Sequence, residues 1–399
     1  MLTKPHISSR AKTMQASPLR KLAATAEARK KQGIKVHHLN IGQPDLPTAS
    51  IVYETIHNIG QPTLAYAPSA GLNPTLTAWK NYFQHVGIEF NESEIVVTSG
   101  GSEAIIFAMC AVCDNQDEII VFEPFYTNYN GFATIANVHL QPVPLSITNG
   151  FHLPSTEEIE KHINGKTKAI LITNPSNPTG TIYSKDELQR IVDLAKKHNL
   201  FLMSDEVYRE FNFDAEFISV MSFPEIRNQA ILLDSCSKRF NVCGARIGVI
   251  ASHNAEVIHA AFKFGMARLS VATIEQLAVV PLLNSPDEYV KPIVEEFRKR
   301  RDVVYETLKT IPGVTYYKPE GAFYIVIGLP VADADDFARW LIEEFEHNKE
   351  TVLIAPAQGF YATPGKGMNE VRLAFTLNLD ELRRSLEIIK FALEAYNKK

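Results

Sequence analysis

The segment Ser235-Cys236-Ser237-Lys238 follows the apolar residues 231–233 and has the chemistry to bind an aldehyde cofactor. Lysine alone supplies a primary amine inside a chain, and a primary amine forms a Schiff base with an aldehyde. The serine hydroxyls beside it suit a phosphate group. Arg246, eight residues after the lysine, could bind that phosphate with both arms of its guanidinium. Taken alone, the segment also fits a surface loop with an ordinary lysine.

A carboxylate is the second candidate group. Asp205 ends the apolar run 200–204, and the carboxyl end of a parallel strand is where α/β sheets bind ligands. A carboxylate at that place can keep a pyridine nitrogen protonated, which strengthens the ring as an electron sink. Asp205 fits equally well as the N-cap of a following helix.

Three further motifs follow predicted strands. Residues 174–180 (NPSNPTG) form a proline- and glycine-rich turn in which Asn177 could donate to a phenolate oxygen. Residues 99–103 (SGGSE) precede a predicted helix, and their glycines let backbone N–H groups approach a phosphate. Tyr126 lies after the next run. Ordinary turn chemistry and packing explain each of these motifs when it stands alone.

The elements that would position these groups are short apolar runs at residues 95–97, 119–122, 169–172, 200–203, 231–233 and 247–250. Runs of this kind are typical of strands that are buried on both faces. Segments such as 184–199 read as crossover helices, and Ser184 and Glu187 there spell a capping box. The pattern predicts an α/β domain with a mainly parallel sheet.

After about residue 285 the pattern changes to that of a smaller α+β domain. Helices are expected at 289–308 and 334–348, strand-like segments at 321–327, 352–354 and 371–375, and a final helix at the C-terminus. Ser17 and Pro18 predict the start of an N-terminal helix that Gly33 ends. We therefore expect an N-terminal segment, 1–47, that packs with the small domain, a large domain, 48–285, and a small C-terminal domain, 286–399.

The composition argues against several classes of protein. A net charge of −5 gives no basic field for nucleic acid, and no apolar run is long enough to span a membrane. The N-terminus has no apolar signal-peptide region, and four scattered cysteines suggest no disulfide framework, so a cytoplasmic protein is expected. Cys110 and Cys113 lie in an apolar run and are expected in the core. No residues have metal-ligand spacing, so no metal is predicted.

Together the five strand-end features resemble the fold-type I, class I aminotransferases. The resemblance runs in order from residues 40–45 (NIGQPD) to 369–375 (NEVRLAF). Its most specific pieces are the NPTG at 177–180, the SDEVY at 204–208, the SxSK at 235–238 with the GxRxG at 244–248, and Arg372. The fold that this resemblance implies is the α/β fold of type I pyridoxal-phosphate transferases, with a smaller α+β domain.

The resemblance implies that pyridoxal 5'-phosphate (PLP) is the cofactor. Lys238 matches the lysine that forms the Schiff base, and Asp205 matches the partner of the pyridine nitrogen. Asn177 and Tyr208 match the donors to the phenolate oxygen, and Tyr126 matches the aromatic residue that stacks on the ring. The groups that match the phosphate site are Gly101, Ser102, Ser235 and Arg246, with Ser237 a weaker candidate.

Other positions match groups that contact the substrate or a second subunit. Arg372 matches the residue that binds the α-carboxylate, Gly42 lies against the substrate, and Asn177 adjoins it. Tyr66 matches a tyrosine that reaches the phosphate of the neighbouring subunit. The resemblance therefore implies a homodimer with shared active sites.

The implied reaction is a ping-pong exchange of an amino group between an amino acid and a 2-oxo acid. The substrate amine displaces Lys238 from the aldehyde, and the freed lysine removes the α-proton and returns it to the cofactor carbon. Tyr208 and Asp205 are expected to act with this lysine in catalysis. One oxo acid leaves before the next enters.

The motifs resemble aspartate aminotransferases most in style, which favours aspartate with 2-oxoglutarate. Some prokaryotic members place a lysine after the two glycines, where it meets the distal carboxylate, but this chain has Ser102 there. Arg268 could substitute for that lysine or form an ion pair at the dimer interface. Alanine and aromatic amino acids stay open as donors.

Two rival functions share the same motifs. A PLP lyase would keep Lys238, Asp205 and Arg372 but eliminate a leaving group. A ligand-sensing domain of a transcription regulator would follow a DNA-binding module, whereas the aminotransferase pattern starts near the beginning of this chain.

Overall fold

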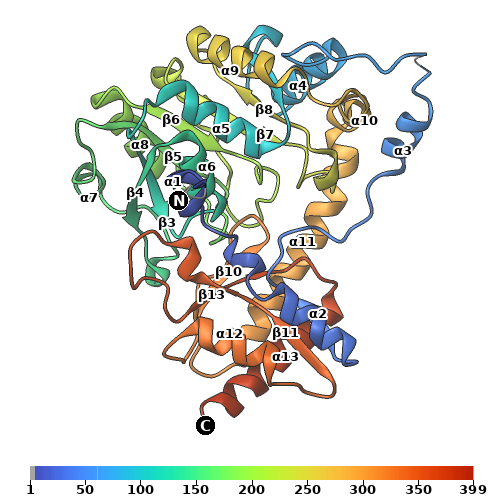
Figure 1. Ribbon diagram of the computed structural model, residues 1–399, viewed down its shortest axis with the longest axis vertical. Helices are drawn as coiled ribbons and strands as arrows, with labels where there is room; N and C mark the ends of the chain where they lie inside the picture. The colour runs from blue at the N-terminus through green and yellow to red at the C-terminus, as the bar shows by residue number, and fades with distance from the viewer. Residues whose placement is uncertain (1–4, 61, 399) are drawn as a thin grey trace.

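The computed structural model describes residues 5–60 and 62–398 and has two lobes (Figure 1). The upper lobe in this view contains a seven-stranded sheet with the order β2-β8-β7-β6-β5-β3-β4. Its strands are β2 (Ile95–Thr98), β3 (Glu118–Glu123), β4 (His139–Pro144), β5 (Thr167–Thr173), β6 (Phe201–Asp205), β7 (Ala230–Ser235) and β8 (Gly248–Ala251). Only β8 runs antiparallel to its neighbours, so the prediction of a mainly parallel sheet is confirmed.

Both faces of this sheet are buried, as the apolar runs predicted. One face packs against α5 (Gly101–Val112), α6 (Asn128–Ala136) and α9 (Ala255–Arg268). The opposite face packs against α8 (Lys185–Lys197) toward one edge, and against α4 (Asn73–His85) and α10 (Thr273–Asn284) toward the other. Neighbouring strand residues alternate between these layers: Met203 belongs to the first and Leu202 to the second. Two short helices, α3 (Ser50–His57) and α7 (Thr156–Glu160), complete the lobe.

The capping box predicted for α8 is confirmed. The Ser184 hydroxyl accepts from the Glu187 amide, and the Glu187 carboxylate accepts from the Ser184 amide. The expectation that both cysteines of the 110–113 pair lie in the core is wrong. Cys110 is exposed, and Cys113 ends α5 in a half-buried position, because this end of the helix lies at the surface.

The lower lobe is built on a four-stranded antiparallel sheet with the order β12-β13-β10-β9. Its strands are β9 (Thr315–Tyr316), β10 (Tyr324–Gly328), β12 (Ala355–Pro356) and β13 (Glu370–Ala374). The lobe also holds α11 (Pro286–Leu308), α12 (Ala334–Glu343) and α13 (Leu379–Tyr396). The helix predicted over 334–348 is shorter and ends at Glu343, and Asn348 and Lys349 adopt positive φ in the turn that leads into the next strand.

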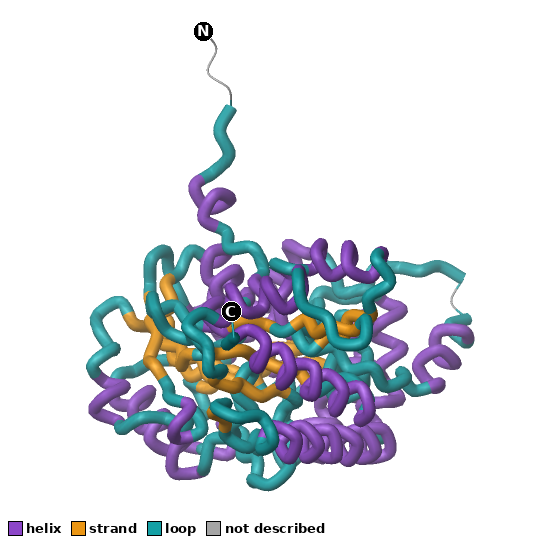
Figure 2. Tube along the Cα trace, turned by 90° about the horizontal axis from the view of Figure 1, so that it is seen from below, coloured by secondary structure: helices purple, strands orange, loops and turns teal. Residues whose placement is uncertain are grey.

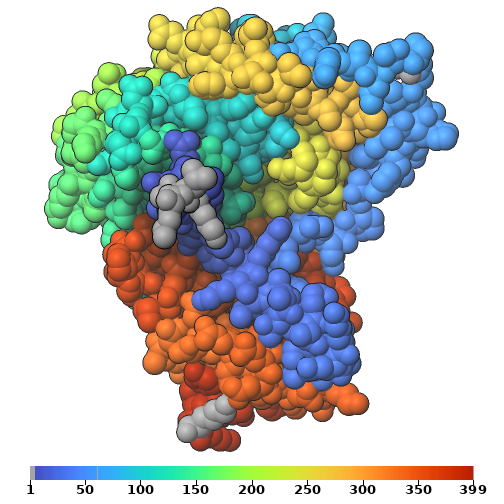
Figure 3. All heavy atoms as spheres, in the orientation of Figure 1, coloured from blue at the N-terminus to red at the C-terminus, as the bar shows by residue number. Residues whose placement is uncertain are grey.

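The N-terminal segment crosses from one lobe to the other (Figure 3). It consists of α1 (Ser9–Thr13), which projects from the body in Figure 2, the 3₁₀ turn η1 (Pro18–Arg20), α2 (Ala23–Lys31) and β1 (Lys35–His38). β1 pairs in parallel with β11 (Glu350–Leu353), and Ala26 of α2 packs against Ile342 of α12. The N-terminal segment therefore lies against the lower lobe along much of its length.

The predicted start of the N-terminal helix is wrong. Ser17 makes no capping hydrogen bond through its side chain, and the residues after Pro18 form only one 3₁₀ turn before α2 begins at Ala23. Gly33 does end the segment as predicted, with a positive φ of 82°. Within the part of the chain that the structure describes, no helix has the length and apolarity to cross a membrane.

Candidate active site

A cavity of about 540 Å³ brings together nearly all of the predicted site residues. Asp205 and Ser235 are the last residues of β6 and β7, and Thr173 ends β5 beside Asp205 in the sheet. Parallel strands thus deliver these groups to one edge, as the strand-end pattern predicted. The predicted residues that line the cavity are Gly42, Gly101, Ser102, Tyr126, Asn177, Asp205, Tyr208, Ser235, Ser237, Lys238, Arg246 and Arg372.

The Lys238 amine lies inside this cavity. Its Nζ donates to the carbonyl of Gly42 at 2.8 Å and lies 5.9 Å from the ring centroid of Phe323. Gly42 lies directly against the Tyr324 ring, so any Cβ at this position would collide with that ring. The absence of a side chain at Gly42 therefore lets the N-terminal segment approach the lysine and Tyr324 together.

Asp205 is a buried carboxylate that forms no ion pair with any described residue. Its Oδ2 accepts from the Tyr129 hydroxyl at 2.8 Å, and its Oδ1 accepts from the Val207 amide at 3.4 Å. Burial raises the pKa of Asp205 to about 6, against the effect of these two donors. A cationic group bound next to Asp205 would offset the free-energy cost of keeping this carboxylate ionised.

Groups suited to a phosphate line the same cavity as Lys238. Gly101 and Ser102 are the first residues of α5, where free N–H groups and the helix dipole favour an anion. The hydroxyls of Ser235 and Ser237 lie 2.8 Å apart. Arg246 adopts a left-handed φ of 54° and donates to the carbonyls of Cys243, at 3.0 Å, and Ser99, at 3.4 Å, with its charge at the rim of the cavity.

Close packing requires a glycine at the second glycine position of the GxRxG segment, Gly248. A Cβ there would lie 2.7 Å from the amide nitrogen of Gly101 and 2.7 Å from the carbonyl oxygen of Asp234. Only glycine permits this close approach of β8 to the first turn of α5. The packing fixes the place of the helix terminus relative to β7.

Arg372 is a buried cation in β13 with no carboxylate partner among the described residues. It is 1% exposed, its Nη1 donates to Asn177 Oδ1 at 3.1 Å, and its Nη2 donates to the Asn40 carbonyl at 2.5 Å. The ring centroid of Tyr324 lies 4.5 Å from its guanidinium carbon. Its Nε is buried and forms no hydrogen bond. A ligand carboxylate would supply the missing countercharge.

Three tyrosines complete the cavity wall. The hydroxyls of Tyr208 and Tyr324 lie 2.8 Å apart. The Tyr126 hydroxyl accepts from Asn128 at 2.8 Å, and burial raises the pKa of Tyr126 to about 12, so its phenol stays neutral at physiological pH. Tyr126 can therefore act as a neutral hydrogen-bonding group.

Three residues that hydrogen-bond to predicted site residues were not themselves predicted from the sequence: Tyr129, Tyr324 and Asn40. Tyr129 lies three residues after Tyr126, and the two ring centroids are 5.5 Å apart, so the spacing from Tyr126 was a signal that could have identified it. Asn40 is the first residue of the NIGQPD segment, but no role was predicted for it. Nothing in the sequence pattern marks Tyr324, because its position depends on how the lower lobe meets the sheet.

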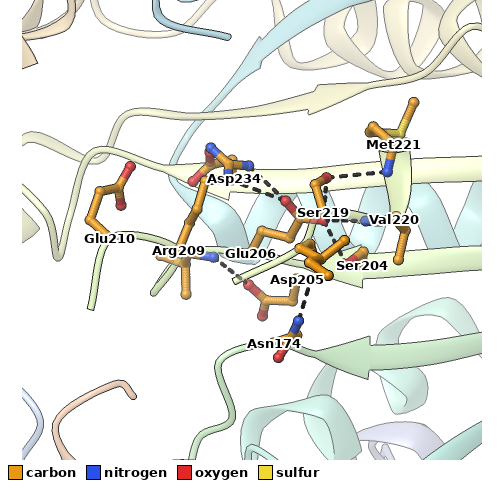
Figure 4. A network of polar contacts seen from close by, with 12 residues as sticks. Asn174, Ser204, Asp205, Glu206, Arg209, Glu210, Ser219, Val220, Met221 and Asp234 are labelled. Atoms are coloured by element: carbon orange, nitrogen blue, oxygen red, sulfur yellow. Dashed lines mark hydrogen bonds and ion pairs between the residues drawn. The ribbon is translucent and has the colours of Figure 1, made fainter. Parts of the chain in front are cut away.

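A buried network of charges lies behind the site (Figure 4). Arg209 donates to Glu206 and to Asp234, both at 2.9 Å, and Arg239 also pairs with Asp234. Glu206 accepts from the hydroxyls of Ser204, at 3.0 Å, and Ser219, at 2.8 Å. Each of these four charged residues is adjacent in sequence to a predicted site residue: Glu206 to Asp205, Arg209 to Tyr208, Asp234 to Ser235 and Arg239 to Lys238.

Two predicted residues lie outside the cavity. Tyr66 is 83% exposed and does not line it. Arg268 forms an ion pair with Glu103, with Nε 3.3 Å from Oε1, and donates to the Val97 carbonyl at 3.1 Å, so it faces its own subunit. Among the described residues, no group of three or more His, Cys, Asp or Glu side chains could hold a metal ion.

Comparison with known proteins places this geometry in a family. The chain is 31% identical to a probable aspartate/prephenate aminotransferase of Aquifex aeolicus over 97% of this chain and 98% of the relative. The solved structure of Thermus thermophilus aspartate aminotransferase with maleate superposes with a TM-score of 0.88 at 28% identity, covering 98% of this chain and all of that one. An alanine aminotransferase from Pyrococcus furiosus superposes with a TM-score of 0.89 at 27% identity, with the same coverage. Residues 34–389 match the aminotransferase class I and II family, and the chain therefore belongs to it and has the fold-type I architecture of these enzymes.

Proposed function

We propose that this aminotransferase holds PLP through Lys238 and exchanges the amino group between L-aspartate and 2-oxoglutarate. The observation that carries the proposal is the arrangement of charge around the Lys238 amine. An unpaired buried carboxylate, Asp205, lies on one side, and the cations Arg246 and Arg372 line the same cavity. This set complements a cofactor with a cationic ring nitrogen and an anionic phosphate, and a substrate with a carboxylate.

The residues present fit PLP at each of its polar ends. The N-terminus of α5, the two serine hydroxyls and Arg246 would hold the phosphate. Asp205 would pair with the pyridine nitrogen, and Tyr126 would cover the ring. Asn177 accepts from Arg372 through Oδ1, so its Nδ2 is free to donate to the phenolate oxygen together with Tyr208.

The chemistry divides between the cofactor and the protein. When bound, PLP supplies an aldehyde carbon for amino groups and an electron-poor ring that accepts an electron pair. Arg372 binds the substrate α-carboxylate and so orients the Cα–H bond toward Lys238. The Lys238 amine takes the proton from Cα and, on the same face of the site, would return it to the carbon that carries the aldehyde in PLP. Asp205 holds a proton on the ring nitrogen, where burial strengthens the pairing.

Because one site serves both substrates in turn, the product oxo acid leaves before the second oxo acid binds, and we expect ping-pong kinetics. Aspartate is favoured as donor because the relatives named above include enzymes for aspartate. Alanine is the second candidate, since the Pyrococcus furiosus neighbour is an alanine aminotransferase.

We also propose a homodimer in which Tyr66 reaches the phosphate of the other subunit. Tyr66 is far more exposed than a tyrosine in a monomer core, and three exposed apolar residues lie in the same region: Leu64, Met266 and Leu269. The segment 65–69 contacts the end of α9 and the start of α10, since the Ala65 carbonyl accepts from Thr273 and the Ser69 carbonyl lies against Gly265.

The proposal is tested with Lys238→Ala beside Lys185→Ala, a control at an exposed position on α8. We expect the first variant to fold but to lose the absorbance of the lysine-bound cofactor, its trapping by borohydride, and transamination. The control should keep all three. Full activity of Lys238→Ala would contradict the assignment. Incubation of the wild type with aspartate alone separates the rival lyase, which would turn over repeatedly without an oxo acid.

A further inference from the structure

The turn η1 places one more cation at the cavity. We infer that Arg20 binds the distal carboxylate of a dicarboxylic substrate, an inference that rests on the proposed aminotransferase function. Arg20 lines the same cavity as Lys238 and Arg372, although it belongs to a segment more than 200 residues away from the lysine in sequence. It therefore adds a positive charge to the site that neither the cofactor nor the α-carboxylate needs.

The other basic residues near the site already have partners or tasks. Lys238 and Arg246 serve the cofactor, and Arg372 is the buried cation for the α-carboxylate. Arg268 is neutralised by Glu103 within its own subunit. Within residues 5–60 and 62–398, by contrast, no carboxylate forms an ion pair with Arg20, and its side chain is exposed at the mouth of the cavity. Ser102 offers only a hydroxyl, so Arg20 is the group that can supply the missing charge.

The backbone on either side of Arg20 is firmly anchored. The Leu19 carbonyl accepts from Asn40 Nδ2 at 2.8 Å, and the Asn40 carbonyl accepts from Arg372 Nη2 at 2.5 Å. One asparagine thus joins the α-carboxylate cation to the residue before Arg20. On the other side, Lys21 pairs with Asp335 of α12 at 2.6 Å. The two arginines, which line the same cavity, are therefore connected through Asn40.

The side chains beside Arg20 suit the carbon chain of such a substrate. Leu19 and Ile41 line the cavity with apolar surface, while Pro18 packs directly on Gly359 and closes the turn against the lower lobe. A substrate that is fixed by Lys238 and Arg372 would extend its side chain toward this wall. A guanidinium there could bind the second carboxylate through two parallel hydrogen bonds.

The exposure of Arg20 has a consequence for selectivity. A buried, unpaired arginine would strongly reject neutral substrates, because it would lose water without gaining a partner. An exposed arginine keeps its water when the substrate is neutral. We therefore expect a graded preference for dicarboxylic over neutral amino acids, and not an absolute one.

Kinetics of Arg20→Gln separate the role of Arg20 from that of the fold. We expect kcat/KM for aspartate to fall roughly 10- to 100-fold, the range for a charge-assisted hydrogen-bonded pair, and kcat/KM for alanine to change by less than about threefold. Arg20→Lys should recover part of the loss, because it restores the charge but not the paired geometry. The control Lys31→Gln removes an exposed positive charge at the end of α2, outside the cavity, and should leave the ratio of aspartate to alanine unchanged.

Binding to the holoenzyme gives a readout without turnover. Succinate and butyrate share a four-carbon chain, but only succinate has a second carboxylate. By calorimetry we expect Arg20→Gln to weaken succinate roughly 10-fold or more and to leave butyrate unchanged. Equal losses for both ligands, or no loss for succinate, would overturn the inference. If the wild type transaminates no donor, the proposed function is wrong. The succinate and butyrate titrations would still show whether Arg20 binds the second carboxylate.

Discussion

At the scale of single residues, the site is a set of charges whose partners are not in the protein. Within residues 5–60 and 62–398, Asp205 is buried beside two hydrogen-bond donors and forms no ion pair, and Arg372 is buried beside an amide, a carbonyl and two aromatic rings and pairs with no carboxylate. Such groups lower the stability of the cofactor-free protein, and bound ligands offset this cost. This arrangement is expected where binding, and not stability, determines the residue type.

The free-energy cost of burying the Asp205 carboxylate can be measured from the pH dependence of the free energy of unfolding. The pKa of Asp205 is raised from 3.8 to about 6, so the folded protein binds more protons than the unfolded chain between these values. The contribution of Asp205 therefore lowers the free energy of unfolding as pH rises from 4 to 6, by up to about 3 kcal/mol for two pKa units. We expect cofactor-free Asp205→Asn to exceed the cofactor-free wild type in urea midpoint at pH 7 and to match it at pH 4. Equal midpoints at pH 7 would contradict this account.

Tyr129 is a positioning residue for the same carboxylate. Its hydroxyl donates to Asp205 and lies 2.7 Å from the Thr173 hydroxyl, and this donation lowers the pKa of Asp205 from what burial alone would give. We expect Tyr129→Phe to weaken PLP binding roughly 10- to 100-fold, as for the loss of one hydrogen bond to a charged group. Titration of the cofactor-free variant with PLP, followed by fluorescence, measures this. Tyr316→Phe, in β9 outside the cavity, is the control and should bind PLP normally.

At the scale of elements, the carboxyl ends of β5, β6 and β7 deliver the site, and the charged network of Figure 4 joins β6 to β7 behind it. Asp234 accepts from two arginines, one from the segment after β6 and one from the segment after β7. Because each member is adjacent in sequence to a site residue, the network fixes the backbone that carries Asp205, Tyr208, Ser235 and Lys238.

The network predicts an effect of mutation that is transmitted to the cofactor. Asp234→Asn keeps the shape but leaves Arg209 and Arg239 with too little negative charge in a buried site, which we expect to cost about 3–5 kcal/mol of unfolding free energy. PLP binding should weaken as well, although residue 234 does not line the cavity. The control Asp287→Asn removes an exposed ion pair with Lys291 and should change neither quantity appreciably. Urea unfolding and PLP titration of both variants test this.

Some of these elements could be predicted from the sequence pattern, and others could not. Strands and their ends were predicted because burial on both faces leaves continuous apolar runs, and parallel strands bring their ends to one edge. The network was not predicted, since the meeting of Arg209 with Asp234 depends on strand order and side-chain direction. The start of the N-terminal helix was predicted wrongly, because Ser17 and Pro18 fit a 3₁₀ turn as well as an α-helix.

At the scale of the whole molecule, the N-terminal segment and the two lobes enclose one site, and a second subunit would complete it. Arg20 comes from the N-terminal segment, Lys238 from the upper lobe and Arg372 from the lower lobe. Tyr66 lies outside this cavity on an exposed surface with Leu64, Met266 and Leu269. The aminotransferase proposal therefore makes assembly a condition of activity.

Hybrid dimers test whether Tyr66 acts on the other subunit. We expect Tyr66→Ala and Lys238→Ala to be poorly active when each is assembled alone. In a hybrid dimer, the Lys238→Ala subunit donates an intact Tyr66 to the subunit that retains Lys238, so one complete site forms. Random mixing of equal amounts should restore about a quarter of the wild-type activity, since half of the dimers are hybrids and each has one complete site of two. If Tyr66 served its own subunit, no hybrid would contain a complete site, and mixing would restore nothing.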